Sequence, residues 1–345
     1  MKTILVSRFS AFGDVVISVN VIKAVIEQNQ DCKIIYLTKK PFPVLFEKIE
    51  RVEAITPDLN GEHKGFLGLY SLSKELKKLN IDIYIDIHNS LRTRILRFFF
   101  SIYGIKNGKI DKGRKEKKAL TRRKNKVLKP LKNTAERYAD VFRKFGIKVD
   151  LSAIKKSEKL VLPLSAKKLL PEKDKKWIGI APFSMHKQKT YPFEKIKQVI
   201  QLLSNKKFQV FIYGGGEKEN NLANELVNEF SNVQNLIGQF ILKDELTVIE
   251  QMDLMFTPDS ASLHLTSLTT TKVLSVWGGT HYFAGFAPNH NPNHSIIEIP
   301  ISELTCRPCS VFGKTACFRD DLACLNMITP QSVVEKIVEL VDSRI

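Results

Sequence analysis

Short apolar runs alternate with amphipathic stretches along most of the chain. Runs typical of buried strands occupy residues 3–6, 33–37, 52–55 and 81–88, and later residues 177–181, 208–213 and 254–256. Between them, apolar side chains recur at helical spacing, as at Val15, Val19, Ile22 and Ile26. Strands that alternate with helices are typical of a doubly wound parallel sheet. We therefore expect an α/β protein.

The length of the chain favours two such sheets rather than one. A chain of 345 residues with 43% hydrophobic residues is too long for one compact core and suits two domains of about 150 residues each. A predicted helix over residues 134–145 closes the first domain, and the charged, proline-containing stretch 163–176 is typical of a linker. The predicted domains are residues 1–162 and residues 177–328, followed by a helix with an apolar stripe over residues 333–341.

The stretch 254–280 carries the clearest candidate ligand site. It runs through an apolar strand, a polar turn, a short helix and a second apolar strand. Asp259 or Ser260 can cap the helix, and the backbone N–H groups that follow, from Ala261 onward, suit a phosphate. His264 lies on the same side of this helix. The alternative interpretation is that Ser260 only caps the helix and that His264 is a packing residue.

A second strand-to-helix corner lies at the N-terminus. It places Asp14 in the first turn of the predicted helix and lacks the G-x-G-x-x-G pattern of dinucleotide-binding corners. An anion is poorly suited to a position beside a carboxylate. Asp14 is therefore either a helix-start charge that the helix dipole favours or a catalytic base that faces a ligand.

Two further corners of the second domain suit a nucleotide. Lys187 and Lys189 lie in the loop after the strand 177–181, and three glycines at 214–216 precede Glu217 after the strand 208–213. A carboxylate at such a strand end can accept hydrogen bonds from the two ribose hydroxyls. The glycines are equally consistent with a tight turn and no ligand.

The charge distribution predicts an anionic partner. The net charge is +18, and residues 106–132 hold thirteen lysines and arginines against Asp111 and Glu116. Nucleic acid, an acidic membrane surface and a phosphorylated substrate are the candidate partners. Glycines at 104, 108 and 113 suggest a mobile basic arm, although a solvated charge run is an open alternative. Nucleic-acid binding is less favoured, because no aromatic residue is interleaved within the run.

Four cysteines near the C-terminus form a C-x2-C-x7-C-x6-C pattern, at Cys306, Cys309, Cys317 and Cys324. The pattern resembles a structural zinc site, but only one close C-x2-C pair is present. Reduced, buried thiols are the favoured interpretation. No apolar run is long enough to cross a bilayer and no signal-peptide core is present, so we expect a cytoplasmic protein.

Four phrases, in this order, resemble the bacterial ADP-heptose:lipopolysaccharide heptosyltransferases of glycosyltransferase family 9: ILVSRFSAFGDVVISVNVIKAV, PFSMHKQKTYPFEK, YGGGEKE and PDSASLHLTSL. The resemblance covers almost the whole chain. It implies a GT-B fold, in which two Rossmann-like domains face each other across a cleft, with the acceptor in the first and the sugar nucleotide in the second. It also implies catalysis without a metal or cofactor, and a final helix, residues 329–345, that crosses back to the first domain.

Carried over residue by residue, the resemblance makes Asp14 the catalytic aspartate. The implied donor-binding residues lie near the diphosphate, the ribose and the sugar, and they are Ser184, Lys189, Glu217, Asp259, Ser260, Ala261 and His264. Ala261 departs from the glycine of the family pattern, so its Cβ slightly crowds the backbone approach to a phosphate.

The resemblance implies an inverting transfer of a heptose, or a related sugar, from ADP-heptose to a lipopolysaccharide inner-core acceptor. Asp14 would take the proton of the attacking hydroxyl. Arg122, Arg123 and Lys124 would bind the anionic lipid-linked acceptor at the inner face of the inner membrane, and no nucleic acid is expected as a partner. Two alternatives stay open: a nucleotide-sugar-binding protein without catalysis, and a nucleic-acid-binding protein that uses residues 106–132.

Overall fold

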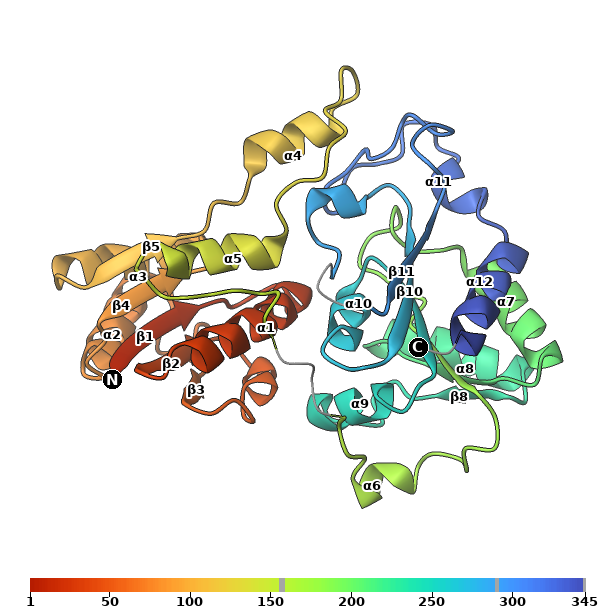
Figure 1. The fold of residues 1–345 in the computed structure, drawn as a ribbon, viewed down its shortest axis with the longest axis horizontal. Helices are drawn as coiled ribbons and strands as arrows, with labels where there is room; N and C mark the ends of the chain where they lie inside the picture. The colour runs from red at the N-terminus through yellow and green to blue at the C-terminus, as the bar shows by residue number, and fades with distance from the viewer. Residues whose placement is uncertain (155–158, 289–291, 344–345) are drawn as a thin grey trace. The chain divides into compact units, whose positions relative to one another are not determined.

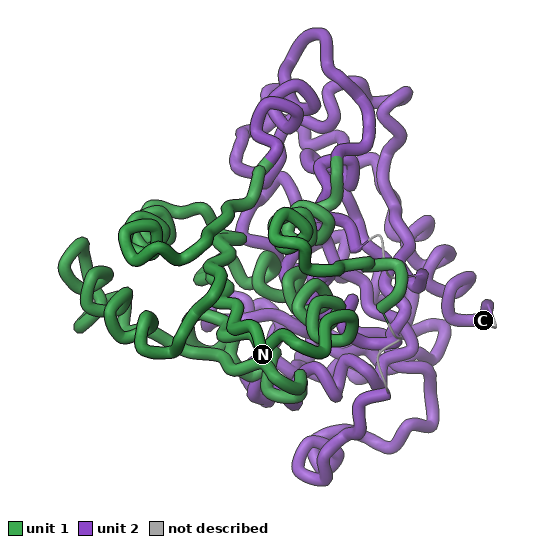
Figure 2. Tube along the Cα trace, turned by 60° about the vertical axis from the view of Figure 1, so that its left-hand side comes forward, with its two compact units in different colours: residues 1–112, 132–155 green, residues 113–131, 156–345 purple. Residues whose placement is uncertain are grey.

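The structure is a computed structural model that describes residues 1–154, 159–288 and 292–343. The chain forms two compact units, which Figure 2 shows in different colours. Unit 1 comprises Met1–Lys112 and Lys132–Lys155, and unit 2 comprises Gly113–Leu131 and Lys156–Ile345. Each unit contains one parallel β-sheet with helices packed against it (Figure 1). The predicted α/β fold with two Rossmann-like units is confirmed.

Unit 1 contains a five-stranded parallel sheet in the order β3-β2-β1-β4-β5. Its strands are β1 (Lys2–Ser7), β2 (Cys32–Leu37), β3 (Val52–Ile55), β4 (Ile83–Asp86) and β5 (Lys106–Lys109). Its helices are α1 (Phe12–Gln28), the 3-10 helix η1 (Phe42–Leu45), α2 (Gly65–Lys77), α3 (Leu91–Ile102) and α5 (Thr134–Arg143). The register pairs Ile4 with Ile34 on one side and with Ile83 on the other.

The two faces of this sheet are covered by different helix pairs. The chain runs from β1 outward to β3 and then returns to β4 and β5, so right-handed crossovers place α1 on one face and α2 and α3 on the other. Helix α1 packs with α5, and α2 packs with α3. Leucines at helical spacing on α2 fill the core of the second face together with α3 and the sheet. These leucines are Leu69, Leu72 and Leu76.

Unit 2 contains a six-stranded parallel sheet in the order β11-β10-β9-β6-β7-β8. Its strands are β6 (Trp177–Ile180), β7 (Gln209–Ile212), β8 (Val233–Asn235), β9 (Leu254–Pro258), β10 (Lys272–Trp277) and β11 (His294–Glu298). Its helices are α4 (Arg114–Thr121), α6 (Leu164–Lys167), α7 (Phe193–Asn205), α8 (Glu217–Glu229), α9 (Leu242–Ile249), α10 (Ala261–Thr266), η2 (Tyr282–Ala284), α11 (Ala323–Asn326) and α12 (Pro330–Asp342). Within the described part of the chain, no helix combines the length and the hydropathy needed to cross a bilayer.

Each sheet has one point at which the strand order reverses. In unit 1 the chain leaves β1 for β2 and later returns to the other side of β1 with β4; in unit 2 the same relation holds for β6, β7 and β9. Loops that leave the carboxyl ends of such neighbouring strands turn in opposite directions and open a crevice, where ligands of α/β proteins bind. The β1/β4 and β6/β9 edges are therefore the natural places for a site in each unit.

The final helix does not follow the expectation that it crosses back to the first domain. The apolar stripe of α12 is buried in the core of unit 2, where the helix packs on α7. Val333, Val334 and Ile337 are all buried there. The stripe was correctly predicted, but its partner lies in the same unit.

The expected domain boundaries and the mobile arm are also corrected. Residues 106–109 form an edge strand of unit 1, whereas residues 113–131 belong to unit 2 and begin with α4. The apolar residues of this basic segment explain its position, because Leu120 and Leu131 pack with Ala284 in a small buried cluster. The contact boundary between the two units near residue 155 also lies earlier than the predicted linker 163–176, which contains α6.

Candidate active site

The site in unit 1 is organised by Asp14, the third residue of α1. Its carboxylate forms an ion pair with Arg8 and accepts a hydrogen bond from the backbone N–H of Ala11, 3.3 Å from Oδ2. The hydroxyl of Tyr138, on α5, donates to Oδ1 at 3.4 Å. The side chain of Asp14 is 24% exposed, so its carboxylate is not sealed from solvent.

The partners of Asp14 are themselves held in place. Arg8 is buried and donates from Nη1 to the carbonyl of Ile87 at 2.8 Å, which ties the loop after β1 to the end of β4. Its guanidinium carbon lies 5.7 Å from the ring centroid of Tyr138. Burial raises the pKa of Tyr138 well above its ordinary value, so the phenol stays protonated and remains a donor. Asp14 is therefore positioned by a cation and a phenol that sequence reasoning did not identify.

His88 lies at the same edge, just after β4. Burial, together with the nearby cations Arg8 and Lys112, lowers its pKa to about 3. The imidazole is therefore neutral near pH 7, and its Nδ1 lies 3.4 Å from the backbone N of Phe9, from which it accepts a hydrogen bond. A group with so low a pKa is a weak base, and the Nδ1 lone pair of His88 is already engaged by Phe9.

The site in unit 2 is centred on Lys189 and Asp259. Lys189 belongs to the loop after β6, Asp259 follows β9, and these two strands are neighbours in the sheet. The ammonium of Lys189 lies 3.0 Å from the carboxylate of Asp259, and both side chains are largely buried. The two predicted donor-binding residues are thus brought together at the edge where the strand order reverses.

Ser260 and His264 lie on the helix that follows Asp259. The Ser260 hydroxyl accepts a hydrogen bond from the backbone N–H of Ser262 at 3.2 Å and thus caps α10, and it lies 2.9 Å from the hydroxyl of Thr257. His264 is buried in the same helix. The capping role of Ser260 is thereby confirmed. Capping leaves the positive end of the α10 dipole, which starts at Ala261, directed at the sheet edge.

The other predicted donor residues lie on the loops after β6 and β7. Ser184 is half-buried, and its carbonyl lies 3.4 Å from the Thr190 hydroxyl, which donates to it. Glu217 is exposed at the first position of α8, after Gly216, whose φ of +84° favours glycine. Sequence reasoning missed Glu219, whose carboxylate accepts from the backbone N–H of Gly215 at 2.8 Å. That contact fixes the glycine turn that presents Glu217.

Glycines after β10 allow the loop that carries Lys189 to pack closely. The backbone N–H of Gly279 donates to the carbonyl of Gln188 at 2.9 Å. A Cβ at Gly278 would lie only 2.8 Å from the same carbonyl oxygen. The paired glycines at the end of a predicted strand were a signal that sequence reasoning could have used.

A buried arginine supports this glycine turn. Arg307 donates to the carbonyl of Gly278 at 2.8 Å and to that of Trp277 at 2.9 Å, and it pairs with Glu298 at 2.8 Å. It has no exposed surface. His281 lies 3.4 Å from the same carboxylate of Glu298. No local pattern distinguishes Arg307 from a surface arginine, so sequence reasoning did not find it.

The basic segment 113–131 is anchored within unit 2. Lys117 lies 4.2 Å from the ring centroid of Phe286, and Arg123 lies 4.5 Å from that of Phe318. Lys126 donates to the carbonyls of Cys306 and Pro308 at 2.6 and 2.7 Å. The expectation of a free arm is therefore wrong, although Arg122, Arg123 and Lys124 are all exposed.

The four C-terminal cysteines are free thiols in a segment that packs on the glycine turn. The backbone N–H of Cys309 donates to the carbonyl of Gly279 at 3.0 Å. Burial raises the pKa of Cys309, and it raises that of Cys324 to about 12, so both side chains are protonated thiols in the metal-free chain near pH 7. Among the residues that the structure describes, these sulfur atoms do not form a group of three within ligand distance. Reduced thiols at these four positions stay a prediction.

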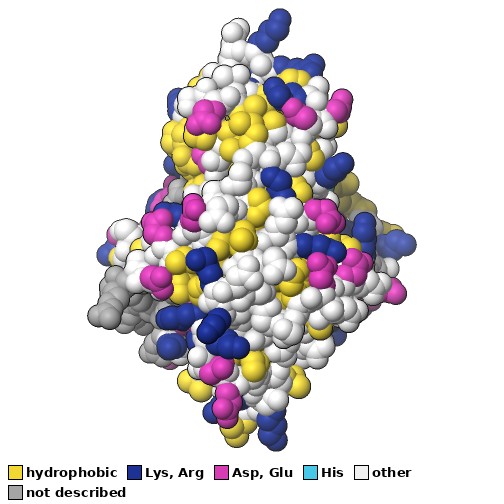
Figure 3. Space-filling model, turned by 90° about the vertical axis from the view of Figure 1, so that its right-hand side faces the viewer, with side chains coloured by type: hydrophobic (Ala, Val, Ile, Leu, Met, Phe, Trp, Pro, Cys, Tyr) yellow, Lys and Arg dark blue, Asp and Glu magenta, His cyan; other side chains and the backbone are white. Residues whose placement is uncertain are grey.

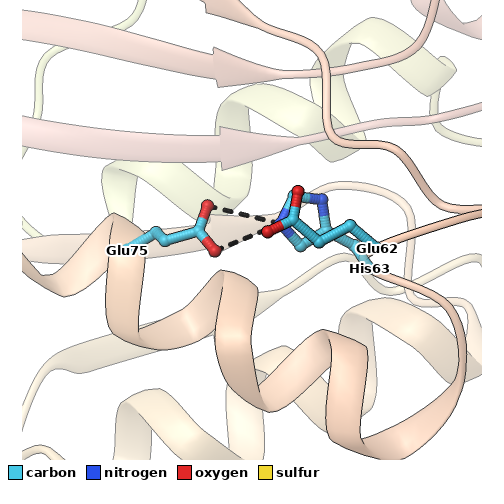
Figure 4. Close-up of side chains that lie close together, drawn as sticks. All are labelled: Glu62, His63 and Glu75. Atoms are coloured by element: carbon cyan, nitrogen blue, oxygen red, sulfur yellow. Dashed lines mark hydrogen bonds and ion pairs between the residues drawn. The ribbon is translucent and has the colours of Figure 1, made fainter.

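In the described ranges, one group brings three possible metal-ligand atoms within 4.8 Å of one another: Glu62, His63 and Glu75 (Figure 4). His63 Nδ1 accepts a hydrogen bond from the backbone N–H of Asp58 at 3.1 Å, so the ring proton of the neutral imidazole lies on Nε2. Nε2 lies 3.3 Å from both carboxylate oxygens of Glu75 and donates to them. The atom that faces Glu75 therefore has no lone pair for a metal, and the group is a hydrogen-bonded pair that ties the preceding loop to α2.

Two Rossmann-like units in one chain, each with polar residues at the edge where its strand order reverses, are the architecture of the GT-B fold. The family model described as glycosyltransferase family 9 (heptosyltransferase) matches residues 69–314. The chain therefore belongs to glycosyltransferase family 9.

The individual proteins that resemble this chain have low sequence identity to it. A lipooligosaccharide heptosyltransferase 2 of Campylobacter jejuni is 27% identical over 136 residues, which cover 38% of this chain and 41% of that protein. The match thus spans about two fifths of the length of the curated relative. A family 9 glycosyltransferase structure from Veillonella parvula has a TM-score of 0.76 at 16% identity and covers 99% of this chain and 97% of its own. The ADP-heptose lps heptosyltransferase II of E. coli has a TM-score of 0.70 at 17% identity, with 99% and 98% covered. These structures support the shared fold.

Proposed function

We propose that the chain is a glycosyltransferase that moves a heptose, or a related sugar, from ADP-heptose to an inner-core acceptor of a lipopolysaccharide. Family membership supports the transfer chemistry, and a structural neighbour, E. coli heptosyltransferase WaaC, is described with ADP-2-deoxy-2-fluoro heptose. The observation that carries the proposal is the Lys189–Asp259 pair at the β6/β9 edge. An α/β sheet binds its nucleotide at such an edge.

The donor half of the reaction is assigned to unit 2. Lys189 and the N-terminal end of α10 offer positive charge to the diphosphate, and this charge is most useful when ADP departs with its extra negative charge. Glu217 begins α8, after β7, which neighbours the strand β6 that precedes the Lys189 loop, and its carboxylate suits the ribose hydroxyls. Asp259 holds the ammonium of Lys189 in place.

The acceptor half is assigned to Asp14. The acceptor hydroxyl attacks the anomeric carbon, the bond from that carbon to the diphosphate oxygen breaks, and the hydroxyl proton passes to the Asp14 carboxylate. A single displacement of this kind inverts the anomeric centre. Arg8 and Tyr138 hold the carboxylate in one orientation, so it needs little rearrangement when the proton moves.

The acceptor itself is proposed to be anionic and lipid-linked, and the protein to work at the inner face of the inner membrane. The net charge of +18 supports an anionic partner. Within residues 113–131, Arg122 and Lys124 are exposed and could contact acceptor phosphates, whereas Lys117 and Lys126 are engaged with unit 2 itself. This engagement gives the nucleic-acid alternative no support.

The test is a transfer assay with the purified protein, ADP-heptose and lipopolysaccharide truncated before its heptoses. We expect release of ADP and a gain of one heptose in the mass of the acceptor, with ADP-glucose as the control donor. Binding of ADP-heptose without ADP release or transfer to any truncated acceptor would instead identify a nucleotide-sugar-binding protein.

A further inference from the structure

The outer sides of α2 and α3 expose an unusual number of large apolar side chains. On α2 these are Phe66 (55% exposed), Leu67 (79%) and Tyr70 (40%), and on α3 they are Leu91 (74%), Phe98 (55%) and Ile102 (63%). We call these six residues the aromatic face. Helices α2 and α3 pack against each other in unit 1, so the six side chains belong to neighbouring elements (Figure 1).

The aromatic face is separate from the stripe that each helix buries. Leu69, Leu72 and Leu76 of α2 and Leu96 and Phe100 of α3 fill the core beneath. A helix that covers one sheet needs one apolar stripe and is normally polar on its outer side. A second apolar stripe at helical spacing therefore indicates a second partner.

Aromatic contacts join the two helices into one surface. The ring of Phe99, which is buried between the helices, lies 5.2 Å from the rings of both Phe66 and Tyr70. Phe98 lies 5.6 Å from the same ring. The exposed rings are thus continuous across the helix pair and are not scattered single residues.

The exposed charges of α2 and α3 are mostly positive. Helices α2 and α3 expose a single acid, Glu75, and four cations, which are Lys74, Lys77, Arg92 and Arg94, whereas Arg97 pairs with the buried Asp86 at 2.9 Å. Glu75 already accepts a hydrogen bond from His63 (Figure 4), and Lys74 lies 4.9 Å from the ring centroid of Tyr70. On the face of the molecule drawn in Figure 3, by contrast, acidic and basic side chains are interspersed.

We propose that the aromatic face docks on an anionic lipid bilayer. Aromatic and aliphatic side chains with adjacent lysines and arginines suit the boundary between acyl chains and anionic headgroups. A second copy of this chain suits the face less well, because a twofold interface would bring the four exposed cations of one helix pair against the same four of the other. The inference adds a docking surface to the proposed function. Only the identity of the membrane rests on that function.

The first test is cosedimentation with vesicles of equal parts phosphatidylcholine and phosphatidylglycerol, compared with phosphatidylcholine alone. The protein should bind the anionic vesicles, and Leu67→Ser/Phe98→Ser should weaken that binding about tenfold or more. The matched control is Leu164→Ser/Ile241→Ser, which removes apolar side chains that are 77% and 67% exposed in unit 2. The control should bind as the wild type does.

A second readout reports insertion directly. Leu67→Trp places a fluorophore on the aromatic face, while the native Trp177 and Trp277 are buried. Emission of this variant should shift to the blue and be quenched by brominated acyl chains when anionic vesicles are added. The vesicles contain neither acceptor nor nucleotide sugar, so this result stands apart from the transfer assay.

Two outcomes would overturn the inference. One is equal vesicle binding by Leu67→Ser/Phe98→Ser and the wild type, with no change in Leu67→Trp emission. The other is a wild-type dimer in sedimentation equilibrium without lipid that Leu67→Ser/Phe98→Ser converts to a monomer, which would assign the aromatic face to a second copy.

Discussion

The ion pair between Lys189 and Asp259 places two opposite charges at the centre of the proposed donor site. The ammonium is held 3.0 Å from a carboxylate in a largely buried position, where a charge interacts more strongly than at the surface. The loop around Gly313 also packs on the alkyl chain of Lys189, because a Cβ at Gly313 would lie 2.7 Å from its Cδ atom. The side chain is therefore fixed before any ligand binds.

Lys189→Met should weaken ADP-heptose binding by about 10- to 100-fold, because one charge-assisted contact to the diphosphate is lost. Isothermal titration calorimetry measures this directly. The matched control is Lys187→Met, an exposed lysine of the same loop, which should leave the affinity unchanged. Lys189→Met/Asp259→Asn removes the unpaired carboxylate and separates lost binding from lost folding. A folded Lys189→Met protein that binds ADP-heptose with wild-type affinity would show that Lys189 does not contact the donor.

Glu245, in the first turn of α9, makes the free energy of unfolding depend on pH. Burial raises the pKa of its carboxyl to about 7 from the ordinary value of 4.5. The folded chain therefore keeps this proton over a pH range in which the unfolded chain releases it. The contribution of Glu245 to the free energy of unfolding is complete below pH 4.5 and is lost as the pH rises to about 7.

Glu245→Gln should remove this loss. The free energy of unfolding of the variant, relative to the wild type, should increase by roughly 3 kcal/mol from pH 4.5 to pH 7. Urea unfolding at several pH values measures the difference, with the exposed Glu172→Gln as the control. A difference that does not change with pH would mean that the carboxyl ionises in the folded chain as it does in the unfolded one.

At the scale of elements, the basic segment 113–131 shows that local sequence patterns do not predict which part of the protein a segment packs against. Its glycines and charges predicted mobility, but its position is decided by Leu120 and Leu131, whose partner Ala284 lies more than a hundred residues away in the sequence. The final helix α12 shows the same limit. Periodicity identified its buried face, yet an apolar stripe carries no information about which core will cover it.

The triple change Arg122→Gln/Arg123→Gln/Lys124→Gln should raise the apparent KM for the lipid-linked acceptor and flatten its salt dependence. The reason is that exposed cations attract an anionic acceptor through screened electrostatics. Donor affinity should stay unchanged. A control with the same charge change at exposed positions is Lys167→Gln/Lys168→Gln/Lys175→Gln. Equal acceptor kinetics in the wild type and the Arg122→Gln/Arg123→Gln/Lys124→Gln variant at low salt would show that these three cations face solvent and do not bind the acceptor.

The cysteine segment should contain reduced thiols and no zinc. Buried thiols with raised pKa values resist deprotonation, and Cys309 is already tied to the glycine turn through its backbone. Protein purified without chelators should contain near-zero zinc by mass spectrometry of the metals. Denatured protein should titrate all five cysteines with a thiol reagent. About one zinc per chain, released only on denaturation, would contradict this account.

At the scale of the whole molecule, the alternation of apolar runs and amphipathic stretches was sufficient to predict two parallel sheets. It was sufficient because each sheet buries its strands on both faces, which leaves a strong local signal. The candidate site was predictable only where it follows strand ends, as for Lys189 and Asp259. Arg8 and Tyr138 could not be assigned to Asp14, because Tyr138 reaches the carboxylate from 124 residues further along the chain. Such contacts depend on how helices α1 and α5 pack.

The central claim is that Asp14 accepts the proton when an acceptor hydroxyl takes the sugar. Asp14→Asn keeps the size of the side chain and its contact with Tyr138 but removes the base. The decisive measurement is the transfer rate from ADP-heptose to truncated lipopolysaccharide at saturating substrates, with donor affinity measured alongside. The exposed Asp31→Asn is the matched control. We predict a rate about 10²-fold or more below that of the wild type, with unchanged donor affinity. A folded Asp14→Asn protein that transfers heptose at a near-normal rate would contradict the account.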